Sequence, residues 1–391
     1  MDYISVRQAA EKWDVSVRQV QALLKDNRIE GATRFDNHAW MIPADTQKPG
    51  DLRHQKKTSD FVSDLDYVIR GSLAPWPSHN PEEILSTISE PRLRLQYEGE
   101  FAYLRGDYER TIGCFHELGD DDAAKLRACP LTIATAISIG DYPLFAEIET
   151  YLKSTIQRDI SPAVTAFAEL GLNTAYVSAI APSMVVDWLK DGDFGALNPL
   201  AKPDAAYKRT KYFQSVFKFE SMLAVAQTTL AFCVLPDEVS FSAIYLRIIC
   251  AIAYAGLGRQ DEAKPYLQEA LRIALPHGFI TPFAESMTAF GNLLEQCLDK
   301  EYAKYLSIAV NQWQHVFSNW MTFHNRFTKE NITSILSLRE YHIAQLAAQG
   351  APYVQIAEQF HISVGRLKTI MHEIYGKLFV KNRKELSQFI L

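Results

Sequence analysis

Cysteine is scarce in this sequence, and long apolar runs are missing. The chain has 5 cysteines among 391 residues, far apart and without a CxxC pair. That spacing favours neither a disulfide framework nor a zinc site, so we expect buried thiols in a reducing compartment. The longest apolar stretch, IICAIAYAGLG, is far shorter than the ~18–20 residues that a membrane span requires. The N-terminus lacks the basic and apolar segments of a secretion signal, so we expect a soluble, cytoplasmic protein without membrane contact.

Motifs for catalysis and for cofactors are missing as well. The 10 histidines show no metal-ligand spacing, and neither a GxSxG elbow nor a dinucleotide-binding glycine loop occurs. The phosphate-binding pattern GxxxxGK[ST] is absent too. The run Asp120–Asp122 is typical of a solvated cluster beside a helix. An enzyme is therefore disfavoured, and we expect no metal, no cofactor and no requirement for ATP.

What the sequence does have is enough apolar residues for packed domains, and an uneven distribution of charge. Hydrophobic residues make up 48% of the chain, and its length suggests two or three domains. The net charge of −6 divides into +2 over residues 1–58, −11 over 59–327 and +3 over 328–391. Basic ends on an acidic body are what a chain needs if only its ends meet the phosphates of DNA.

Two short helical patterns open the chain, each after a serine that can cap it. Ser5 precedes the first pattern, over residues 5–13, and Ser16 precedes the second, over residues 17–28. Two short helices joined by a tight turn form the helix-turn-helix pattern. The apolar residues predicted to line the inward face of the second helix are Val17, Val20, Leu23 and Leu24.

Two strand-like pieces follow, Gly31–Phe35 and His38–Ile42, around a turn at Asp36–Asn37. From Tyr3 to about Pro49 the chain resembles the excisionase and MerR-type winged helix-turn-helix. The resemblance implies major-groove contacts from the second helix and backbone or minor-groove contacts from the wing. The alternative is that these residues form only a solvated helix face. The residues implied on the helix are Arg18, Gln19, Gln21 and Lys25, and those on the wing are Arg34 and His38.

Four further helical patterns lie between residues 336 and 386. The first ends at Gly350, the second covers Tyr353–Phe360, the third covers Val364–Leu378 after Ser363, and the fourth starts near Arg383. Five apolar residues are predicted to face inward from the third helix: Leu367, Ile370, Met371, Ile374 and Leu378.

This segment resembles the LuxR-type helix-turn-helix throughout. Landmarks in register are Arg339-Glu340, the AAQG turn, Ile356-Ala357-Glu358, Ile362-Ser363-Val364-Gly365, Leu367-Lys368-Thr369 and IYGKL. The residues that the resemblance makes available for DNA are Ser363, Arg366, Lys368, Thr369 and Lys377. Three departures put the affinity and groove geometry in question: Pro352-Tyr353-Val354 in place of small polar residues, Ile370 for histidine and Phe379 for glycine.

The middle of the chain contains a helical repeat. Gly106-Asp107-Tyr108 and Gly140-Asp141-Tyr142 are thirty-four residues apart, the period of the tetratricopeptide repeat (TPR), and Gly258 marks a further copy. Stacked repeats of this kind form a solenoid. Together with the C-terminal segment, the arrangement looks like that of MalT-type LuxR regulators without their nucleotide-binding module. Gly192–Pro203 is predicted to be an irregular insert.

These patterns predict a mainly α protein of three domains. They are a winged helix-turn-helix over 1–49, a TPR-like body over 61–327 after a linker at 50–60, and a four-helix LuxR-type domain over 328–391.

The function that follows is that of a bacterial transcriptional regulator that binds double-stranded DNA. We expect a homodimer whose body senses a small-molecule or peptide effector, with a cationic partner favoured by the acidic body. A body that is only a rigid spacer is the alternative to a sensor, and an interaction adaptor with one degenerate helix-turn-helix is the alternative to the regulator. Trp313, Phe317, Trp320 and Phe323 form an aromatic stripe that indicates core packing, or else a dimer or interdomain seam.

Overall fold

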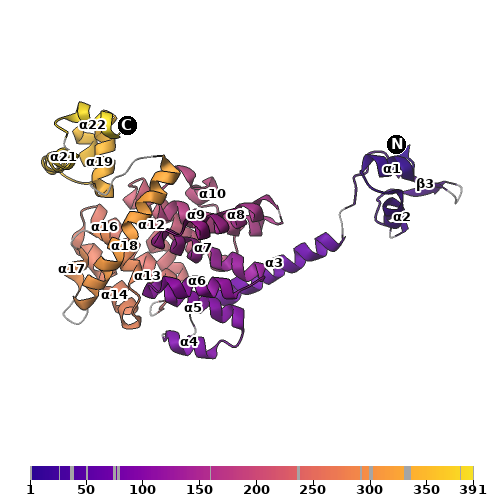
Figure 1. The fold of residues 1–391 in the computed structure, drawn as a ribbon, viewed down its shortest axis with the longest axis horizontal. Coiled ribbons are helices and arrows are strands. Elements are labelled where there is room, and N and C mark those ends of the chain that lie inside the picture. Colours follow the sequence, from indigo (N-terminus) through magenta and orange to yellow (C-terminus); the bar gives the residue numbers. More distant parts are fainter. Residues whose placement is uncertain are drawn as a thin grey trace. The chain divides into compact units, whose positions relative to one another are not determined.

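The computed structural model describes residues 2–25, 27–35, 39–49, 52–73, 76, 80–158, 160–235, 238–290, 293–298, 303–329, 336–378 and 380–390. The described chain is mainly α-helical, as predicted (Figure 1). It divides into two compact units, Met1–Phe61 and Val62–Leu391, and each is considered by itself below. None of the helices that the structure describes combines the length and apolarity needed to span a membrane.

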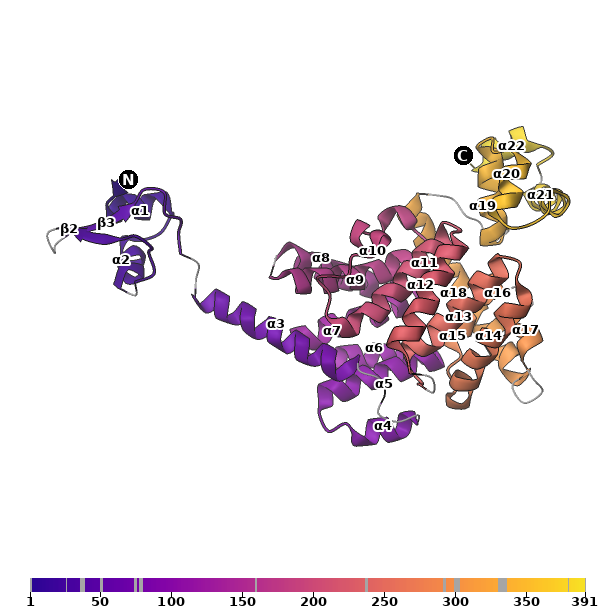
Figure 2. The ribbon, with the colours of Figure 1, turned by 180° about the vertical axis from the view of Figure 1, so that it is seen from behind.

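The first unit consists of two short helices and a small antiparallel sheet. Its strand order is β1-β3-β2, with β2 and β3 forming the predicted hairpin (Figure 2). The strand β1 was not predicted, and it pairs Tyr3 with Pro43 and Ile4 with Ile42. The elements are β1 (Tyr3–Ile4), α1 (Val6–Lys12), α2 (Val17–Lys25), β2 (Thr33–Phe35) and β3 (Ala39–Pro43).

Serine caps begin both helices, as the sequence predicts. The Ser5 hydroxyl accepts a hydrogen bond from the Gln8 backbone N–H, and the Gln8 side chain accepts one from the Ser5 backbone. Ser16 and Gln19 repeat this capping box at α2. The helices then close on a small apolar core made of Ala9, Ala10, Trp13, Val20, Leu24, Ile29 and Ile42.

Two details of α2 differ from the prediction. The side chain of Val17 is 41% exposed, so its assignment to the inward face was wrong. Val17 is the first residue of the helix, directly after the Ser16 cap, and the helix packs on the core only from its later residues. The helix ends at Lys25, three residues before the predicted Arg28. Residue Asn27 takes a left-handed backbone (φ 51°), which ends the helix.

The linker predicted over residues 50–60 is helical from Leu52 onward. These residues form the first part of α3 (Leu52–Ser72), which continues into the second unit. Polar composition indicated solvent exposure, but after Gly50 the segment has neither proline nor glycine until Gly71 to interrupt a helix. The composition of this segment is therefore compatible with a helix as well as with an irregular linker.

The body of the second unit is built from paired antiparallel helices, as the repeat period predicts. Residues 192–201, within the predicted irregular insert, hold turns and a single 3₁₀ turn, and α11 begins at Lys202. The helices are α4 (Pro81–Thr87), α5 (Pro91–Arg105), α6 (Tyr108–Glu117), α7 (Asp122–Ile139), α8 (Tyr142–Gln157), α9 (Pro162–Ser178), α10 (Asp187–Asp191), α11 (Lys202–Ser215), α12 (Phe219–Cys233), α13 (Phe241–Gly256), α14 (Gln260–Ala274), α15 (Thr281–Glu285), α16 (Met287–Phe290), α17 (Leu293–Cys297) and α18 (Ala303–Thr328).

The inner helices of this body close into a ring. In the order α5, α7, α9, α11, α13, α15, each helix contacts the next, and α15 also contacts α5. Two residues of α15 contribute to closure. The Glu285 carboxylate accepts hydrogen bonds from the hydroxyls of Tyr103 on α5 and Tyr245 on α13, and the Thr281 hydroxyl donates to the backbone oxygen of Tyr103. The repeats thus surround an interior. An open solenoid would instead present a concave groove.

The repeated Gly-Asp-Tyr motifs have one geometry. Gly106 and Gly140 end α5 and α7 in the left-handed backbone region, with φ of 81° and 76°. Asp107 and Asp141 follow at once and cap α6 and α8 through their carboxylates. The motif therefore encodes a sharp helix-to-helix turn, which only glycine adopts without strain.

The long helix α18 lies across these turns. A Cβ on Gly106 would meet the Gln312 side chain at 3.0 Å, and one on Gly140 would meet Asn319 at 2.7 Å. The Asn319 amide donates to the backbone oxygen of Ser138 (3.0 Å). The two glycines thus also give α18 the room to seat its polar side chains on the ring.

The C-terminal part of the second unit consists of four helices, as predicted. The predicted inward residues of its third helix are all buried. Ser337 caps the first helix in a capping box with Glu340, and Gly350 (φ 98°) follows its end. The helices are α19 (Leu338–Ala348), α20 (Tyr353–Gln359), α21 (Val364–Leu378) and α22 (Arg383–Ile390).

The turn glycines yield a first prediction. Gly258→Ala is expected to lower the free energy of unfolding by about 1 kcal/mol. The left-handed backbone of Gly258 (φ 75°) strains any side chain, although a Cβ at this position would meet nothing within 4 Å. Gly140→Ala is expected to cost about 1 kcal/mol more, since the new Cβ displaces Asn319 from Ser138. Urea denaturation of the intact chain measures both.

Gly376→Ala is the matched control, because Gly376 lies inside α21 with nothing within 4 Å of a Cβ. It is expected to be neutral or stabilising by up to about 1 kcal/mol. Equal losses for Gly140→Ala and Gly258→Ala would contradict the proposed seating of α18.

Candidate DNA-binding surfaces and an internal cavity

Helix α21 has one buried and one exposed face. Ser363, Arg366, Lys368 and Thr369, all predicted for DNA, are exposed at its N-terminal end. The Ser363 hydroxyl accepts from the Arg366 backbone N–H (3.1 Å), and the Thr369 hydroxyl donates to the Gly365 oxygen (3.3 Å). Among the described residues, no hydrogen bond or ion pair engages the charged groups of Arg366 and Lys368. Both cations are thus available to a phosphate or a base edge.

Lys377, also predicted for DNA, lies at the other end of α21. Eleven residues separate it from Arg366, which is roughly 16 Å along a helix. Its ammonium lies 2.7 and 2.8 Å from the two carboxylate oxygens of Glu340, whose side chain is only 12% exposed. Lys377 therefore holds α21 to the capping box of α19, a role that its place in the sequence did not show.

Two arginines of this segment are also occupied by internal contacts. The Arg339 guanidinium donates to the backbone oxygen of Phe360 (3.0 Å), and burial together with the nearby Arg366 lowers its pKa. Arg383 donates to the backbone oxygens of Ala347 and Ala351 at the end of α19. Part of the positive charge of this segment thus maintains its fold.

The predicted departures at the start of α20 have structural consequences. Pro352 occupies the cap position without any side-chain hydrogen bond, and the Val354 side chain is 58% exposed. The hydroxyl of Tyr353 lies 3.3 Å from that of Tyr375 on α21. Ile370 is buried in the core, while Phe379 lies outside the described residues. This turn therefore offers apolar surface where small polar groups were expected.

The N-terminal unit carries a second candidate surface, on α2. Arg18, Gln21 and Lys25 are exposed and spaced three and four residues apart, so they share one face of the helix. The Gln19 side-chain oxygen is used in the capping box with Ser16. On the hairpin, the Arg34 guanidinium lies 4.7 Å from the centre of the Trp40 ring. His38 lies outside the described residues.

Comparison with known proteins settles the nature of the C-terminal helices. Residues 334–390, which include all four of them, match the family described as "Bacterial regulatory proteins, luxR family". The C-terminal segment is a LuxR-type helix-turn-helix domain. The expectation from the sequence is thereby confirmed for this domain. The matched residues do not include the N-terminal unit, whose resemblance to winged helix-turn-helix domains stays a prediction.

A longer stretch of the chain is similar to proteins described as "HTH-type transcriptional regulator MalT". The relative from Cronobacter sakazakii is 27% identical over 151 residues, which cover 34% of this chain and 17% of the relative. That from Vibrio campbellii is 27% identical over 154 residues, covering 35% and 17%. That from Serratia proteamaculans is 26% identical over 177 residues, covering 39% and 20%. The matched part thus spans a fifth or less of these relatives. No solved structure matches the chain.

The LuxR-type domain packs on the body through the aromatic stripe of α18. Phe317 and Trp320 pack against the core of the domain, and the Trp320 indole donates to the backbone oxygen of Ser178. Trp313 packs on the core of the body, and Phe323 is buried against Tyr142 and Phe145. The stripe combines core packing with an interdomain seam, in which Phe323 is buried and Trp313, Phe317 and Trp320 are half-buried.

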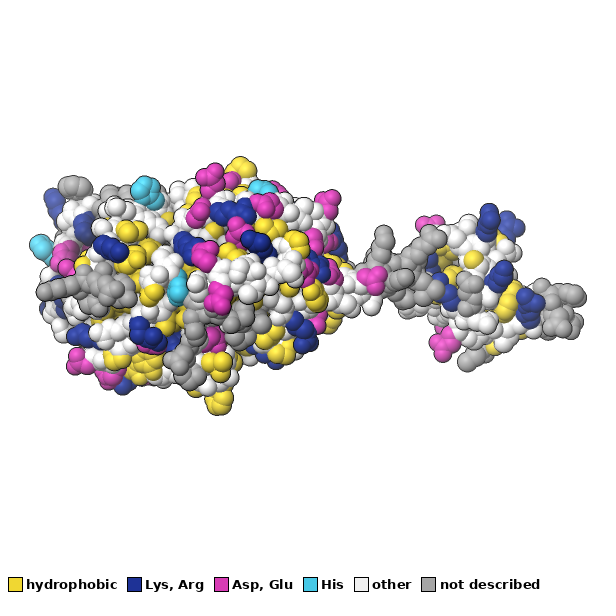
Figure 3. All heavy atoms as spheres, turned by 90° about the horizontal axis from the view of Figure 1, so that it is seen from below, with side chains coloured by type: hydrophobic (Ala, Val, Ile, Leu, Met, Phe, Trp, Pro, Cys, Tyr) yellow, Lys and Arg dark blue, Asp and Glu magenta, His cyan; other side chains and the backbone are white. Residues whose placement is uncertain are grey.

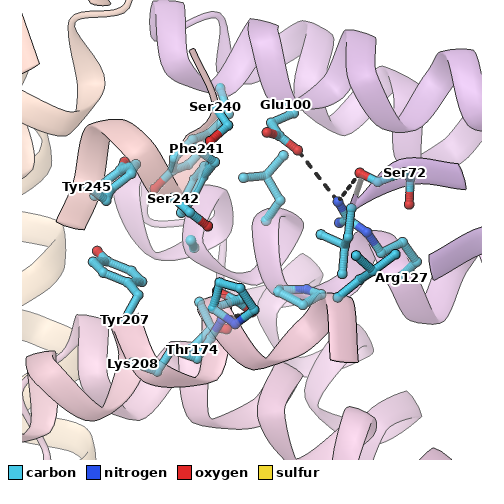
Figure 4. A pocket seen from close by; sticks show the side chains of 18 of the residues that line it. Ser72, Glu100, Arg127, Thr174, Tyr207, Lys208, Ser240, Phe241, Ser242 and Tyr245 are labelled. Atoms are coloured by element: carbon cyan, nitrogen blue, oxygen red, sulfur yellow. Dashed lines mark hydrogen bonds and ion pairs between the residues drawn. The ribbon is translucent and has the colours of Figure 1, made fainter. Parts of the chain in front are cut away.

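A cavity of about 340 Å³ opens inside the ring of the body. Figure 4 shows Arg127 directed towards Glu100 and Ser72, with Tyr207 and Tyr245 at some distance from them. The rings of these two tyrosines lie 5.1 Å apart. Burial raises the pKa of Glu100 to about 7, against the effect of the Arg127 cation. No group of histidine, cysteine, aspartate and glutamate in the described part of the chain could hold a metal ion.

The Lys377–Glu340 pair yields a second prediction. Burial by itself would raise the pKa of Glu340, but the hydrogen bonds from Lys377 and Ser337 outweigh it and lower the pKa below 4.5. Ionised Glu340 therefore stabilises the fold at neutral pH, and this contribution is lost as the pH falls through the lowered pKa. Lys377→Ala is expected to destabilise the domain by about 1 kcal/mol at pH 7 and by much less once Glu340 is protonated.

Calorimetric unfolding of the intact chain at neutral and acidic pH measures this effect. Lys368→Ala is the control, because it removes the same charge from α21 without removing an ion pair, and it should leave stability within about 0.5 kcal/mol. A loss from Lys377→Ala that is the same at both pH values would refute the role assigned to the pair.

Proposed function

We propose that the protein is a transcriptional regulator that binds specific DNA sequences through its LuxR-type domain. One observation carries the proposal. In a domain that matches the LuxR family, Arg366 and Lys368 project from the exposed N-terminal half of α21 without an ion pair to any residue that the structure describes. A helix that enters the major groove contacts base edges with its N-terminal residues, and this is where these cations lie.

The N-terminal unit is proposed as a second DNA-binding element. Support comes from the shared exposed face of Arg18, Gln21 and Lys25 and from the hairpin that follows α2. On the face in Figure 3 this small unit shows several lysine and arginine side chains and few acidic ones, whereas the large unit mixes both signs. Arginine and glutamine side chains can make paired hydrogen bonds to guanine and adenine.

The ring-shaped body is proposed to sense a small molecule. Support comes from the cavity inside the ring, whose mainly apolar lining also carries charged and hydroxyl groups. A ligand that prefers one arrangement of these helices over another would shift the equilibrium between them.

The adaptor alternative rests on the start of α20. Exposed Val354 and the uncapped Pro352 are unsuited to phosphate, and they would suit a protein partner better. DNA-binding measurements on the intact chain with substitutions in each candidate surface separate the two functions.

A third prediction concerns two cations of the DNA-binding surfaces. After selection of bound fragments from random DNA, Lys368→Ala is expected to weaken binding to all sequences and to lower the salt dependence by about one counter-ion. Arg18→Ala is expected to cost about 1–3 kcal/mol on preferred sites and to relax the choice of base. Fluorescence anisotropy titrations at several salt concentrations measure both.

Lys153→Ala on the outer helix α8 is the control, since it removes only a surface ion pair with Glu149. Absence of any DNA binding at low salt would refute the regulator and favour the adaptor. Equal, sequence-blind losses from Lys368→Ala and Arg18→Ala would refute base contact by Arg18.

A fourth prediction concerns self-association. We propose a homodimer, because single helix-turn-helix units bind short sites and gain affinity by pairing. Since the aromatic stripe already packs in the core and the seam, Phe232 (86% exposed) and Leu235 (66% exposed) near the end of α12 are the candidate contact. Phe232→Asp should turn the dimer into a monomer in sedimentation, because a charge would then be buried in the interface. A wild-type chain that sediments as a monomer with and without DNA would exclude the dimer.

A further inference from the structure

We infer that the cavity where the body meets the LuxR-type domain binds a small organic anion with an aromatic body, and that Lys211 is its counter-ion. The inference rests on the proposed sensing role and names the place and the chemistry of the ligand. The step from binding to regulation depends on the proposed function, whereas binding itself does not.

Two cavities meet at Lys211. The one inside the ring has about 340 Å³, and a second of about 520 Å³ extends from it to the seam with the LuxR-type domain. Both are lined by Tyr207, Lys211 and Glu285. Volumes of this size accommodate small organic ligands.

The acidic side chains around the ring cavity already have partners. A buried carboxylate that is already paired gains little from a cationic ligand, because its desolvation is already offset. The pairs are Glu100 with Arg127 (3.5 Å), Asp204 with Lys208, Glu285 with the hydroxyls of Tyr103 and Tyr245 (2.8 Å to the latter), and Glu238 with Ser240 (2.6 Å).

Lys211 is different. Within the described residues its ammonium has neither a hydrogen bond nor an ion pair, and its electrostatic neighbour Glu285 is already bound by two tyrosines. Partial burial lowers the pKa of Lys211, which reflects the cost of holding this charge where water reaches it only in part. An anionic group beside Lys211 would remove that cost and form a charge-assisted hydrogen bond.

Further polar groups beside Lys211 lack partners as well. The indole N–H of Trp313 and the side-chain oxygen of Gln214 are buried without a hydrogen bond, and both line the larger cavity. No hydrogen bond among the described residues uses the hydroxyl of Tyr207. Buried polar atoms are normally satisfied, so a donor, an acceptor and a cation around one cavity are groups that a polar ligand would satisfy.

The far end of the larger cavity is aromatic. Phe317 and Trp320 of α18 and Phe217 of the body line it together with Phe360 of the LuxR-type domain. The rings of Phe217 and Phe360 lie 4.6 Å apart, and those of Phe317 and Trp320 lie 5.8 Å apart and stack. Such walls suit a flat aromatic body. A ligand anchored at Lys211 would therefore touch both the body and the DNA-binding domain.

This inference departs from the cationic partner that the acidic body led us to expect. Net charge describes the surface as a whole, whereas a ligand responds to the groups it touches. Among the described groups around the cavities, the acids have hydrogen-bond or ion-pair partners and the Lys211 ammonium has none.

Titration calorimetry of the intact chain with three probes tests the inference. Naphthalene-2-acetate has the anion and the ring, naphthalene-2-acetamide has the ring alone, and acetate has the anion alone. The first is expected to bind, and the other two are expected to bind at least tenfold more weakly. Lys211→Met is expected to weaken the first probe about tenfold to a hundredfold, while Lys211→Arg should retain most of the affinity. Lys153→Met, on the outer surface, should leave it unchanged.

A second measurement needs no ligand. A partly buried lysine without an ion pair lowers the stability of the unliganded protein. Lys211→Met is therefore expected to raise the melting temperature of the unliganded chain by about 2 °C. A lower melting temperature would show that Lys211 instead stabilises Glu285 and would overturn the inference. Equal affinities for the acid and its amide, equal affinities of wild type and Lys211→Met, or no binding of the acid at millimolar concentration would overturn it too.

These outcomes are separate from those that test the proposed function. Probe binding is measured without DNA, and DNA binding without probe. A chain that binds DNA but not the acid refutes the anion site alone, and a chain that binds the acid but no DNA refutes the regulator alone.

Discussion

The half-buried carboxylate of Glu285 joins three inner helices of the repeat ring. Glu285 accepts hydrogen bonds from Tyr103 and Tyr245, which belong to helices nearly 150 residues apart in the chain. Burial raises its pKa, while the two hydroxyls and the neighbouring Lys211 oppose that rise. The Thr281 hydroxyl of α15 also donates to the backbone oxygen of Tyr103 (2.6 Å), so two polar contacts tie α15 to α5. With these contacts, the inner helices surround a cavity.

The closed ring in turn positions α18. Its Gln312 donates to the hydroxyls of Tyr108 and Thr281, and its Asn319 donates to the backbone at the end of α7. The same helix turns Phe317 and Trp320 towards the core of the LuxR-type domain. One continuous set of contacts therefore leads from the interior of the ring to the domain that is proposed to meet DNA. A ligand in that interior would act on elements that already touch the DNA-binding domain, without needing a distant relay.

Charge in this protein has to be considered group by group. The basic ends suggested a general attraction to phosphate, yet Arg339, Lys377 and Arg383 are engaged in internal contacts of the LuxR-type domain. The acidic body suggested a cationic partner, yet its interior pairs its carboxylates and leaves Lys211 open. In both places the net charge was counted correctly, but it did not show which charged groups can bind a partner. That depends on which residues lie beside each group in the folded structure.

Local features of the fold followed from the sequence by itself. Serine caps at Ser5 and Ser16, the left-handed glycines at Gly106 and Gly140, and the apolar face of α21 were all predictable, because each depends on residues within one or two helical turns. The LuxR-type domain was predictable for the same reason, since its landmarks lie in one continuous segment. Ring closure, the seating of α18 on the glycine turns, the pairing of Lys377 with Glu340 and the position of Lys211 beside Glu285 were decided only by the tertiary structure. Each depends on groups that lie from about forty to more than one hundred and eighty residues apart, and no local pattern records which of them meet.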